Sequence, residues 1–506
     1  MTDKAPDTDV LVVGAGPTGL LLAAELAQTG VATTLVERRH TESNLTRAFA
    51  IHARTLEALD ARGTADELVA GGVTVDSIRI FGAADLNLTR LPTRFPFVLV
   101  TPQYETERVL RKRAEAVGVR MRWGTELVSL RQDADGVEAE LRGPDGTVRT
   151  ERTPYLVGAD GVHSTVRRAV GLPFIGRSSV MSSLVLADVQ LAEPPTDVLT
   201  VNGTGDGFAF IAPFGDGWYR VITWYRHRQL PDDAPATLEE VREDTRRALG
   251  TDYGMHDARW LSRFHNDERQ APHYRQGRVL LAGDAAHTHS PAGGQGMNTG
   301  LQDAFNLGWK LAAVVRGRAD DALLDSYEAE RHPVGQAVIR RTGTLVRVVL
   351  LRTPPLRAVR GLVGRTVLHA GPVVDKVAGA LSGIAIRYEA GPHAHPSAGA
   401  RAPDLPLSGA GGANRLYEAL RTGRFVLLTA DPSETAALDG RVADAVDVHA
   451  VADSRAAAVP PLILVRPDGY VAWATDEPDR DHRRRDLTAA LDHWCTAPDR
   501  DAARSG

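Results

Sequence analysis

Three glycine-rich segments, far apart along the chain, constrain this sequence more than any other feature. They are GAGPTG at residues 14–19, GADG at 158–161, and a third in two parts, Gly283-Asp284 followed by GGQGMN at 293–298. The first segment by itself would indicate only a bound dinucleotide. An acidic turn and a further glycine-rich loop at these separations predict one long cofactor that the chain contacts in three places.

The first segment lies where a strand-to-helix turn is expected. Val10–Val13 is an apolar run typical of a buried parallel strand, and Leu20–Gln28 has the apolar spacing of a helix. In such a turn Gly14 allows the tight bend, Gly16 lets backbone amides approach a pyrophosphate, and Gly19 allows close helix packing. The amino terminus of the helix adds partial positive charge. The segment therefore predicts a pyrophosphate site made by Gly14, Gly16, Pro17, Thr18 and Gly19.

Acidic residues end the neighbouring predicted strands. Glu37 ends the second strand, where its carboxylate can accept hydrogen bonds from a ribose and disfavours a 2′-phosphate. Two later apolar runs end at Asp160 and Asp284, and open α/β sheets bind ligands at the carboxyl ends of their strands. We expect Asp284 to accept hydrogen bonds from ribityl hydroxyls, whereas Asp160 by itself could equally be a solvated turn residue. The cofactor that fits three such contacts is FAD, and Arg38, next to Glu37, is included among its candidate contacts.

The third segment continues into a loop and a long helix. Residues 291–298 would present backbone amides at the start of a helix that we expect to run to about Arg316. A reduced flavin carries negative charge near N1 and O2, which a helix amino terminus stabilises. The candidate cofactor contacts here are Pro291, Gly294, Gly296, Met297 and Asn298.

Strand patterning predicts an α/β chain in several parts. After Gly171 the pattern changes to short alternating strands at 183–191, 198–203, 207–214 and 218–225, which predict a mostly antiparallel sheet inserted into a parallel one. We also expect helices over 48–62, 105–116 and 485–494. The predicted division is a discontinuous FAD-binding domain (1–71, 103–172 and 271–343), a substrate-binding sheet domain (72–102 and 173–270), a helical bridging segment (344–400) and a C-terminal domain (401–506).

Composition is typical of an intracellular multidomain protein. The chain has 506 residues, of which 43% are hydrophobic and 24% charged, and its net charge of −5 argues against a nucleic-acid partner. Cys495 is the only cysteine, so no intrachain disulfide can form. We find no secretory signal and no uncharged span of transmembrane length, and expect a cytoplasmic protein. The basic stretch 344–388 could lie on a membrane, but Pro354, Pro355 and Gly361 break it into short helices.

Taken together, these residues resemble one family. GAGPTG, the segment TRAFAIHARTLE at 46–57, GADG, and the GDAAH and GMN sequences between 283 and 298 are similar to the single-component FAD-dependent aromatic hydroxylases of the p-hydroxybenzoate hydroxylase fold. The similarity is greatest to polyketide hydroxylases of the tetracycline, anthracycline and angucycline type and to rifampicin monooxygenases. It implies a Rossmann-like FAD-binding domain of the GR2 type, an antiparallel sheet that covers the flavin, and a C-terminal thioredoxin-like domain, here without a Cys-x-x-Cys pair.

The resemblance also implies roles for individual residues. Arg47 would contact either the flavin ring or its pyrophosphate, Gln103 would contact the cofactor, and Arg108 is a weaker candidate. Pro291 would face the reacting region through its backbone carbonyl. Arg47 and Pro291 are the only catalytic candidates, because flavin chemistry needs no side-chain nucleophile or triad.

Aromatic and histidine residues carry further expectations. Four aromatic residues of the inserted strands would suit a flat, apolar substrate, although aromatic residues on a sheet can equally be ordinary core. They are Phe208, Phe210, Trp218 and Trp224. His287 and His289 flank the third segment without convincing carboxylate or cysteine partners at ligand spacing, so we interpret them as structural and expect no metal.

The reaction implied by the family is aromatic hydroxylation. NADPH or NADH would reduce the flavin, O2 would add to form a C4a-hydroperoxide, and one oxygen would pass to an electron-rich ring. No second dinucleotide fingerprint follows a strand, so nicotinamide would bind only transiently.

Several readings stay open at this point. They are hydroxylation of a polycyclic polyketide, inactivation of a rifamycin-like antibiotic, Baeyer–Villiger insertion, a flavin reductase or halogenase (although no Trp-x-Trp-x-Ile-Pro segment occurs), and a binding protein that merely carries FAD. We expect a small aromatic substrate and a monomer or homodimer.

Overall fold

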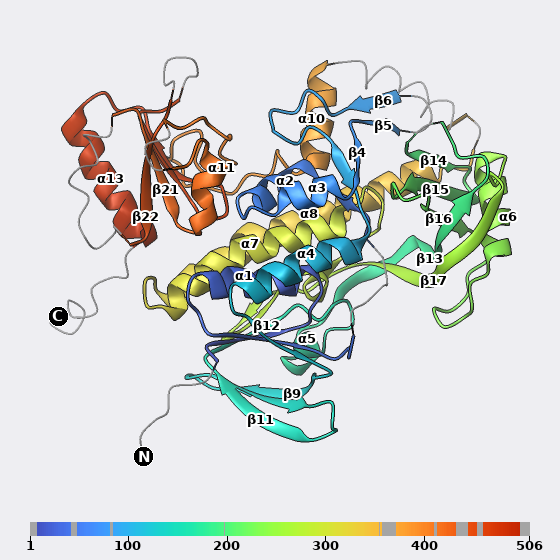
Figure 1. The fold of residues 1–506 in the computed structure, drawn as a ribbon, viewed down its shortest axis with the longest axis horizontal. Coiled ribbons are helices and arrows are strands. Elements are labelled where there is room, and N and C mark those ends of the chain that lie inside the picture. Colours follow the sequence, from blue (N-terminus) through green and yellow to red (C-terminus); the bar gives the residue numbers. More distant parts are fainter. Residues whose placement is uncertain are drawn as a thin grey trace.

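Two large sheets form the centre of the molecule, and a smaller C-terminal domain packs beside them (Figure 1). The computed structural model describes residues 8–41, 48–80, 84–196, 198–353, 355–356, 371–408, 412–431, 444–452 and 459–495. The fold is a mixed α/β fold. Among the described residues, no helix combines the length and the apolar character that crossing a bilayer requires.

The first sheet brings the three glycine-rich segments together. Its strand order is β18-β19-β12-β1-β2-β8, and all pairs except β18–β19 are parallel. The strands are β1 (Val10–Val13), β2 (Thr33–Glu37), β8 (Arg120–Trp123), β12 (Tyr155–Gly158), β18 (Arg275–Gln276) and β19 (Val279–Leu281). Because β1, β12 and β19 are neighbours in register, the segments that follow them meet at one edge of the sheet. This confirms that the three motifs adjoin.

Both faces of this sheet are covered, which explains why its strands are continuous apolar runs. One face carries α1 (Pro17–Gln28), α4 (Gln103–Ala116) and α7 (Gln295–Val315). The other side is covered by a three-stranded antiparallel sheet of β9 (Glu126–Gln132), β10 (Val137–Arg142) and β11 (Val148–Thr153), with α5 (Thr165–Ala169) beside it (Figure 1). Residues of β1, α1, β10 and α7 share one hydrophobic core.

The second sheet is antiparallel throughout, as the alternating pattern predicted. Its order is β14-β15-β16-β13-β17-β20. The strands are β13 (Ile175–Leu191), β14 (Thr200–Gly203), β15 (Gly207–Pro213), β16 (Tyr219–Tyr225), β17 (Met255–Gln270) and β20 (His287–Thr288). The helix α6 (Leu238–Leu249) packs on one face. The short strand β20, which belongs to the third glycine-rich region, pairs with the end of β17 and joins the two sheets.

Between these sheets, the helix expected over residues 48–62 is shorter than predicted. Ala50–Ile51 forms β3, which pairs with β7 (Val98–Val100), and α2 begins only at Ala53 and ends at Asp60. The side chain of Asn298 accounts for the difference, because it holds the backbone of Ala50 and His52 extended. The neighbouring elements are α3 (Ala65–Ala70), β4 (Val73–Val75), β5 (Ser77–Ile80) and β6 (Ala84–Asn87).

A long helix and the C-terminal domain complete the chain. The helix α8 (Asp325–Val349) is continuous through residue 343, where we placed a domain boundary, and α10 (Gly371–Ser382) follows. The C-terminal sheet has the order β22-β21-β23-β24, with only β21–β22 parallel. The elements are α11 (Leu416–Ala419), β21 (Phe425–Thr429), β22 (Val446–Ala450), β23 (Leu462–Val465), β24 (Val471–Thr475) and α13 (Arg480–Cys495).

Candidate cofactor and substrate site

The three glycines of the first segment serve different purposes. Gly14 has φ +105°, and a Cβ there would lie 2.5 Å from the Ala159 carbonyl oxygen; a Cβ on Gly19 would lie 1.9 Å from the Gly14 carbonyl oxygen. Packing within the protein therefore requires both to be glycine. Gly16, in contrast, has no atom within 4 Å of a Cβ built on it, and it is the N-cap of α1 without a side-chain cap. This open approach to a helix amino terminus fits a pyrophosphate.

The next two residues begin α1 and connect two of the motifs. Pro17 occupies the first turn, where a missing N–H costs nothing. Thr18 packs against the third motif: a Cβ on Gly283 would lie 2.7 Å from its Oγ1, and a Cβ on Gly300 only 2.4 Å. Thr18 therefore sets the spacing between the first and third glycine-rich segments.

Glu37 lies at the end of β2 and faces the first segment. Its Oε2 accepts a hydrogen bond from Ala15 N (2.8 Å), and its Oε1 accepts from the backbone N and from Nε of Arg39 (3.0 Å each). Burial would raise the pKa of Glu37, but the hydrogen bonds and charge of Arg39 together with the Ala15 amide hold it below its ordinary value. The ion-pair partner of Glu37 is Arg39, and Arg38, a candidate cofactor contact, is exposed.

The two other acidic residues differ in their surroundings. Asp160 is largely enclosed, and its Oδ2 accepts hydrogen bonds from Thr165 N (2.6 Å) and Val166 N (3.1 Å) at the start of α5; burial raises its pKa. One carboxylate oxygen of Asp160 is thus used within the turn, while Oδ1 is buried without a hydrogen-bond partner among the described residues. Asp284 is exposed at the end of β19, on the edge shared with the first segment. Of the two, Asp284 is the one exposed at this edge of the sheet.

The side chain of Asn298, a candidate cofactor contact, holds the third loop in place. Asn298 donates from Nδ2 to the carbonyls of Ala50 (2.9 Å) and Gly294 (2.8 Å), and its Oδ1 accepts from His52 N (2.8 Å). The ring of His52 donates from Nε2 to the Gly293 carbonyl (2.8 Å). His52 was missed by sequence reasoning, although it lies in the segment that carries the family resemblance. It connects α2 to the loop.

The remaining members of this loop surround the start of α7. Gly294 has φ +62° and is the N-cap of α7 without a side-chain cap, so the first amides of the helix have no side-chain acceptor from the cap. Met297 is buried, and a Cβ on Gly296 would lie 3.7 Å from His289 Nε2. Pro291 lines the cavity described below. This arrangement fits the negative charge of a reduced flavin ring.

Of the three arginine and glutamine candidates, two lie among the described residues. Arg47 lies outside the described residues. Gln103 starts α4, where its Oε1 accepts from Ala48 N (3.0 Å) and its Nε2 donates to Glu107 (2.8 Å). Arg108 is half exposed and pairs with Glu105 (2.9 Å) and Glu67 (3.2 Å) on the surface of α4.

A cavity of about 270 Å³ lies between the third loop and the antiparallel sheet. Phe208 and Phe210 of β15 line it, and the rings of Phe210 and Phe49 lie 5.1 Å apart. The polar side chains among its described lining residues are His52 and Asn202. Other parts of the wall come from β3, β16, α8 and the third loop, including Ala50, Ile222, Pro291, Ala292, Gly293, Gly294, Leu345, Val346 and Val349.

The two tryptophan candidates do not line this cavity. Trp224 lies directly opposite Phe208 in the sheet register, but it is only 1% exposed and is enclosed in the core, with Arg226 5.1 Å from its ring. Trp218 is covered by Arg259 at 4.7 Å. The aromatic face is therefore divided between cavity wall and ordinary core, and strand alternation cannot separate the two.

The histidines of the third region are structural, but for a different reason than expected. His287 does have a carboxylate partner, because its Nε2 lies 2.7 Å from Asp303 Oδ2. The other oxygen of Asp303 pairs with Arg331 (2.7 Å), and its Oδ2 also accepts from Gly283 N (3.1 Å), so the cluster supports the turn before Asp284. His289 donates from Nδ1 to the Ser290 carbonyl. No group of three or more metal-ligating side chains occurs in the part of the chain that the structure describes.

The fold and this site define an enzyme that binds a flavin dinucleotide beside a covered apolar pocket. The open approach at Gly16, the capless amino termini of α1 and α7, and the acceptors Glu37 and Asp284 fit the pyrophosphate, ring and hydroxyl groups of FAD.

Comparison with known proteins gives the family. Residues 7–342 match the FAD binding domain family, and residues 395–498 match the aromatic-ring hydroxylase C-terminal family. The 12-dehydrotetracycline 5-monooxygenase/anhydrotetracycline 6-monooxygenase of Streptomyces rimosus is 39% identical over 97% of this chain and 99% of its own. The rifampicin monooxygenase of Streptomyces venezuelae is 40% identical over 93% of this chain and 96% of its own. The crystal structure of CabE, an aromatic hydroxylase from angucycline biosynthesis, superimposes with a TM-score of 0.85 at 36% identity, covering 97% of this chain and 99% of its own. The chain therefore belongs to the FAD-dependent aromatic-ring hydroxylases, a family of monooxygenases that use NAD(P)H and O2.

Proposed function

We propose that this monooxygenase hydroxylates an uncharged, polycyclic aromatic compound of the polyketide type. The observation that carries the proposal is the cavity between the third glycine-rich loop and the antiparallel sheet. It adjoins the loop expected to hold the flavin ring, and it is walled by aromatic and aliphatic side chains. The relatives named above act on a tetracycline intermediate and on rifampicin, which agrees with a large ring system.

The polarity of the cavity narrows the substrate further. None of its described lining residues carries a charge. Asn202 binds the Ala248 carbonyl and Gly203 N, and His52 donates from Nε2 to the Gly293 carbonyl, which leaves His52 Nδ1 as an acceptor without a partner among the described residues. A substrate carboxylate would lose its hydration there without a partner, which is costly. A neutral ring system would instead bury its area and stack on Phe208 and Phe210.

Bound FAD would supply the redox chemistry, accepting electrons from the nicotinamide and activating O2. The protein holds and shields it. Gly16 and the start of α1 would bind the pyrophosphate, Glu37 and Asp284 the hydroxyl groups, and the amino terminus of α7 would stabilise negative charge on the ring. Pro291 is proposed to face the reacting ring with its carbonyl, and Arg47, outside the described residues, to contact the cofactor.

The division of the chain belongs to the same proposal. We assign residues 1–71, 103–172 and 271–343 to cofactor binding, 72–102 and 173–270 to substrate binding, and 344–400 to a bridge. The parallel β21–β22 pair beside antiparallel β23 and β24 supports a thioredoxin-like domain over 401–506. Cys495 is buried, which raises the pKa of its thiol to about 12, so disulfide exchange is not its function. A cytoplasmic monomer or homodimer remains our expectation.

The test uses the FAD-loaded enzyme with NADPH and a panel of neutral polycyclic phenols, each paired with an analogue bearing a carboxylate on the ring. We expect neutral members to accelerate NADPH oxidation, because an occupied pocket would shift the flavin toward a position that nicotinamide can reach. Their products should contain one labelled oxygen atom from ¹⁸O₂. Preference for the carboxylates would contradict the substrate class. Oxygen derived from water, or full conversion without O2, would exclude a monooxygenase and favour a reductase. Insertion of oxygen next to a ketone would indicate the Baeyer–Villiger alternative, and efficient oxidation of a rifamycin the inactivating one.

A further inference from the structure

The helix α2 runs from the cavity to the C-terminal domain. All eight of its residues, Ala53–Asp60, are buried. At its amino end, the N-cap His52 and the preceding Ala50 line the cavity. At its carboxyl end, Asp60 accepts hydrogen bonds from Arg415, the N-cap of α11 in the C-terminal domain. The helix therefore contacts the substrate pocket at one end and a different domain at the other.

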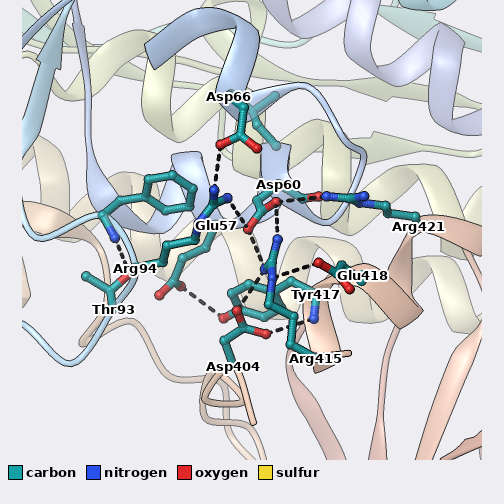
Figure 2. Close-up of polar contacts among 12 residues, drawn as sticks. Glu57, Asp60, Asp66, Thr93, Arg94, Asp404, Arg415, Tyr417, Glu418 and Arg421 are labelled. Carbon is teal, nitrogen blue, oxygen red and sulfur yellow. Dashed lines mark hydrogen bonds and ion pairs between the residues drawn. The ribbon is translucent and has the colours of Figure 1, made fainter. Parts of the chain in front are cut away.

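The carboxylate of Asp60 forms ion pairs with arginines on two sides. Arg415 donates to both of its oxygens, at 2.6 and 2.9 Å, while Arg421 from the same domain and Arg94 from the other side pair with it at 3.3 and 3.2 Å (Figure 2). Asp60 is only 1% exposed, and burial would raise its pKa, but Arg415 and Arg94 hold the pKa below the ordinary value. Arg415 is itself oriented by Asp404 (2.8 Å) and Glu418 (3.1 Å). A bidentate pair of this kind fixes direction as well as distance.

The earlier turns of α2 contact the same domain. Glu57 accepts from Arg401 (2.8 Å) and from the Tyr417 hydroxyl (3.1 Å), and Arg54 donates to the Asp468 carbonyl (2.6 Å). Just beyond the helix, Arg62 donates to the carbonyls of Leu420 (3.1 Å) and Pro467 (3.0 Å). These contacts are polar and directional although they are buried. Buried ion pairs are weak evidence for stability, so a function in placement is the better account of them here.

The other end of α2 transmits that placement to the flavin loop. The ring of His52 holds the Gly293 carbonyl, and its backbone N–H donates to Asn298, which also binds Gly294 and Ala50. A helix of two turns is about 12 Å long and does not bend appreciably, so a displacement at Asp60 is carried to His52.

We propose that the C-terminal domain sets the position of the cavity wall through α2, and that Asp60 and Arg415 are positioning residues for the hydroxylation. This inference rests on the proposed function for its catalytic consequence. A wall shifted by even 1 Å would misplace the ring to be hydroxylated, and such misplacement can cost up to about 100-fold in rate. NADPH oxidation would then end in hydrogen peroxide: NADPH, a proton and O2 give NADP⁺ and H2O2, without hydroxylated product.

Arg415→Met in the full-length, FAD-loaded enzyme tests this inference. At a temperature where the variant is folded, we expect a shifted visible absorption spectrum of the bound flavin, measured without substrate, and a fall of about three- to ten-fold in product formed per NADPH consumed. Arg415→Lys keeps the positive charge but cannot form the bidentate pair, so it should partly restore both the flavin spectrum and the product formed per NADPH. The matched control is Arg242→Met, which removes ion pairs with Glu239 (3.2 Å) and Asp252 (2.9 Å) on α6, away from α2.

A lower melting temperature with unchanged spectrum and product ratio would overturn the inference, as would equal changes in Arg242→Met. If Arg415→Met fails to fold, Arg421→Met, whose side chain is 42% exposed, removes the weaker contact and should produce the same changes on a smaller scale. The flavin spectrum requires no substrate. A spectral shift in a protein that hydroxylates nothing would therefore retain the positioning effect and reject the proposed function.

Discussion

The two six-stranded sheets of this molecule carry their functional groups in opposite ways. The parallel sheet places function at the ends of its strands, in turns where packing requires Gly14 and Gly19 and where Gly16 leaves room for the cofactor. The antiparallel sheet places function on one face, in side chains such as Phe208 and Phe210 that need only be apolar and well shaped. Cofactor binding can therefore be predicted from sequence motifs, whereas substrate binding depends on an apolar surface that many sequences could form.

The largest effect should come from closing Gly16, the open glycine of the first motif. Gly16→Val places a side chain in the space where a pyrophosphate would approach, so we expect folded but colourless protein. Gly71→Ala is the control, because a Cβ there meets its nearest atom at an ordinary 3.8 Å. Retention of stoichiometric yellow FAD by Gly16→Val, measured by absorbance, would break the assignment of function to this strand end.

A second change at the same edge should weaken the cofactor without expelling it. Asp284→Ala removes an acceptor for ribityl hydroxyls and should cost about 1 to 3 kcal/mol in FAD binding, with slower flavin reduction. Titration of the apoprotein with FAD measures this, against Asp135→Ala as an exposed control. Equal affinity in the two variants would show that Asp284 only completes a turn.

The face of the antiparallel sheet can be tested by two aromatic truncations. Phe210→Ala should weaken the binding free energy of a polycyclic substrate by about 1 to 2 kcal/mol through lost burial and stacking. KM should rise accordingly, while FAD retention stays intact. Trp218→Ala removes an aromatic residue of the same strand pair outside the cavity and should leave KM unchanged. If both variants raise KM equally, the cavity does not delimit the substrate site.

The junction of the two sheets should respond to acid. Burial lowers the pKa of His52 and His289 to about 4, so between pH 6.5 and pH 4 the unfolded chain binds protons that the folded chain refuses. The free energy of unfolding should therefore fall as the pH is lowered through this window, by up to about 1.4 kcal/mol per pH unit for each histidine. Denaturant unfolding at pH 7, 6 and 5 should show that the free energy of unfolding falls less with acid in His52→Gln than in the parent enzyme. An identical pH dependence would show that His52 does not contribute to it.

The smallest effect is expected outside both sheets. Cys495→Ser, at the end of α13, should leave turnover unchanged, because the thiol is buried and its raised pKa keeps it protonated. Steady-state rates of the two proteins make the comparison. A clear loss of activity would require a thiol function that the structure gives no reason to expect.

Sequence reasoning succeeded where local patterns decide structure. The runs before residues 14, 158 and 283 are apolar because their strands are buried on both faces, so their order and meeting point were predictable. The strand β17 was not predicted because it contains many charged residues. These are satisfied only in the folded protein, as Arg263 is by Glu240 (2.7 Å) and Glu268 by Arg177 (3.1 Å). Such pairs depend on tertiary structure and leave no periodic pattern.

The candidate site shows the same limit. Strand alternation indicates that Phe208 and Phe210 share one face of their strand, but the boundary between cavity and core depends on what packs above that face. Asn298 was recognised as part of a motif, yet its contacts with Ala50 and His52 arise from residues almost 250 positions away. The position of such partners cannot be derived from spacing along the chain.

The pairing of β20 with β17 has a consequence for anyone who would recombine these enzymes. Thr288 and His287 belong to the segment that follows Asp284, yet they are hydrogen-bonded into the antiparallel sheet opposite Arg269 and Gln270. In a chimaera that exchanged the inserted sheet between two relatives at residue 270, β17 and β20 would come from different parents. The two strands of this pair would then no longer be matched to each other. The natural exchange unit extends through residue 288, so specificity and part of the flavin loop are inherited together.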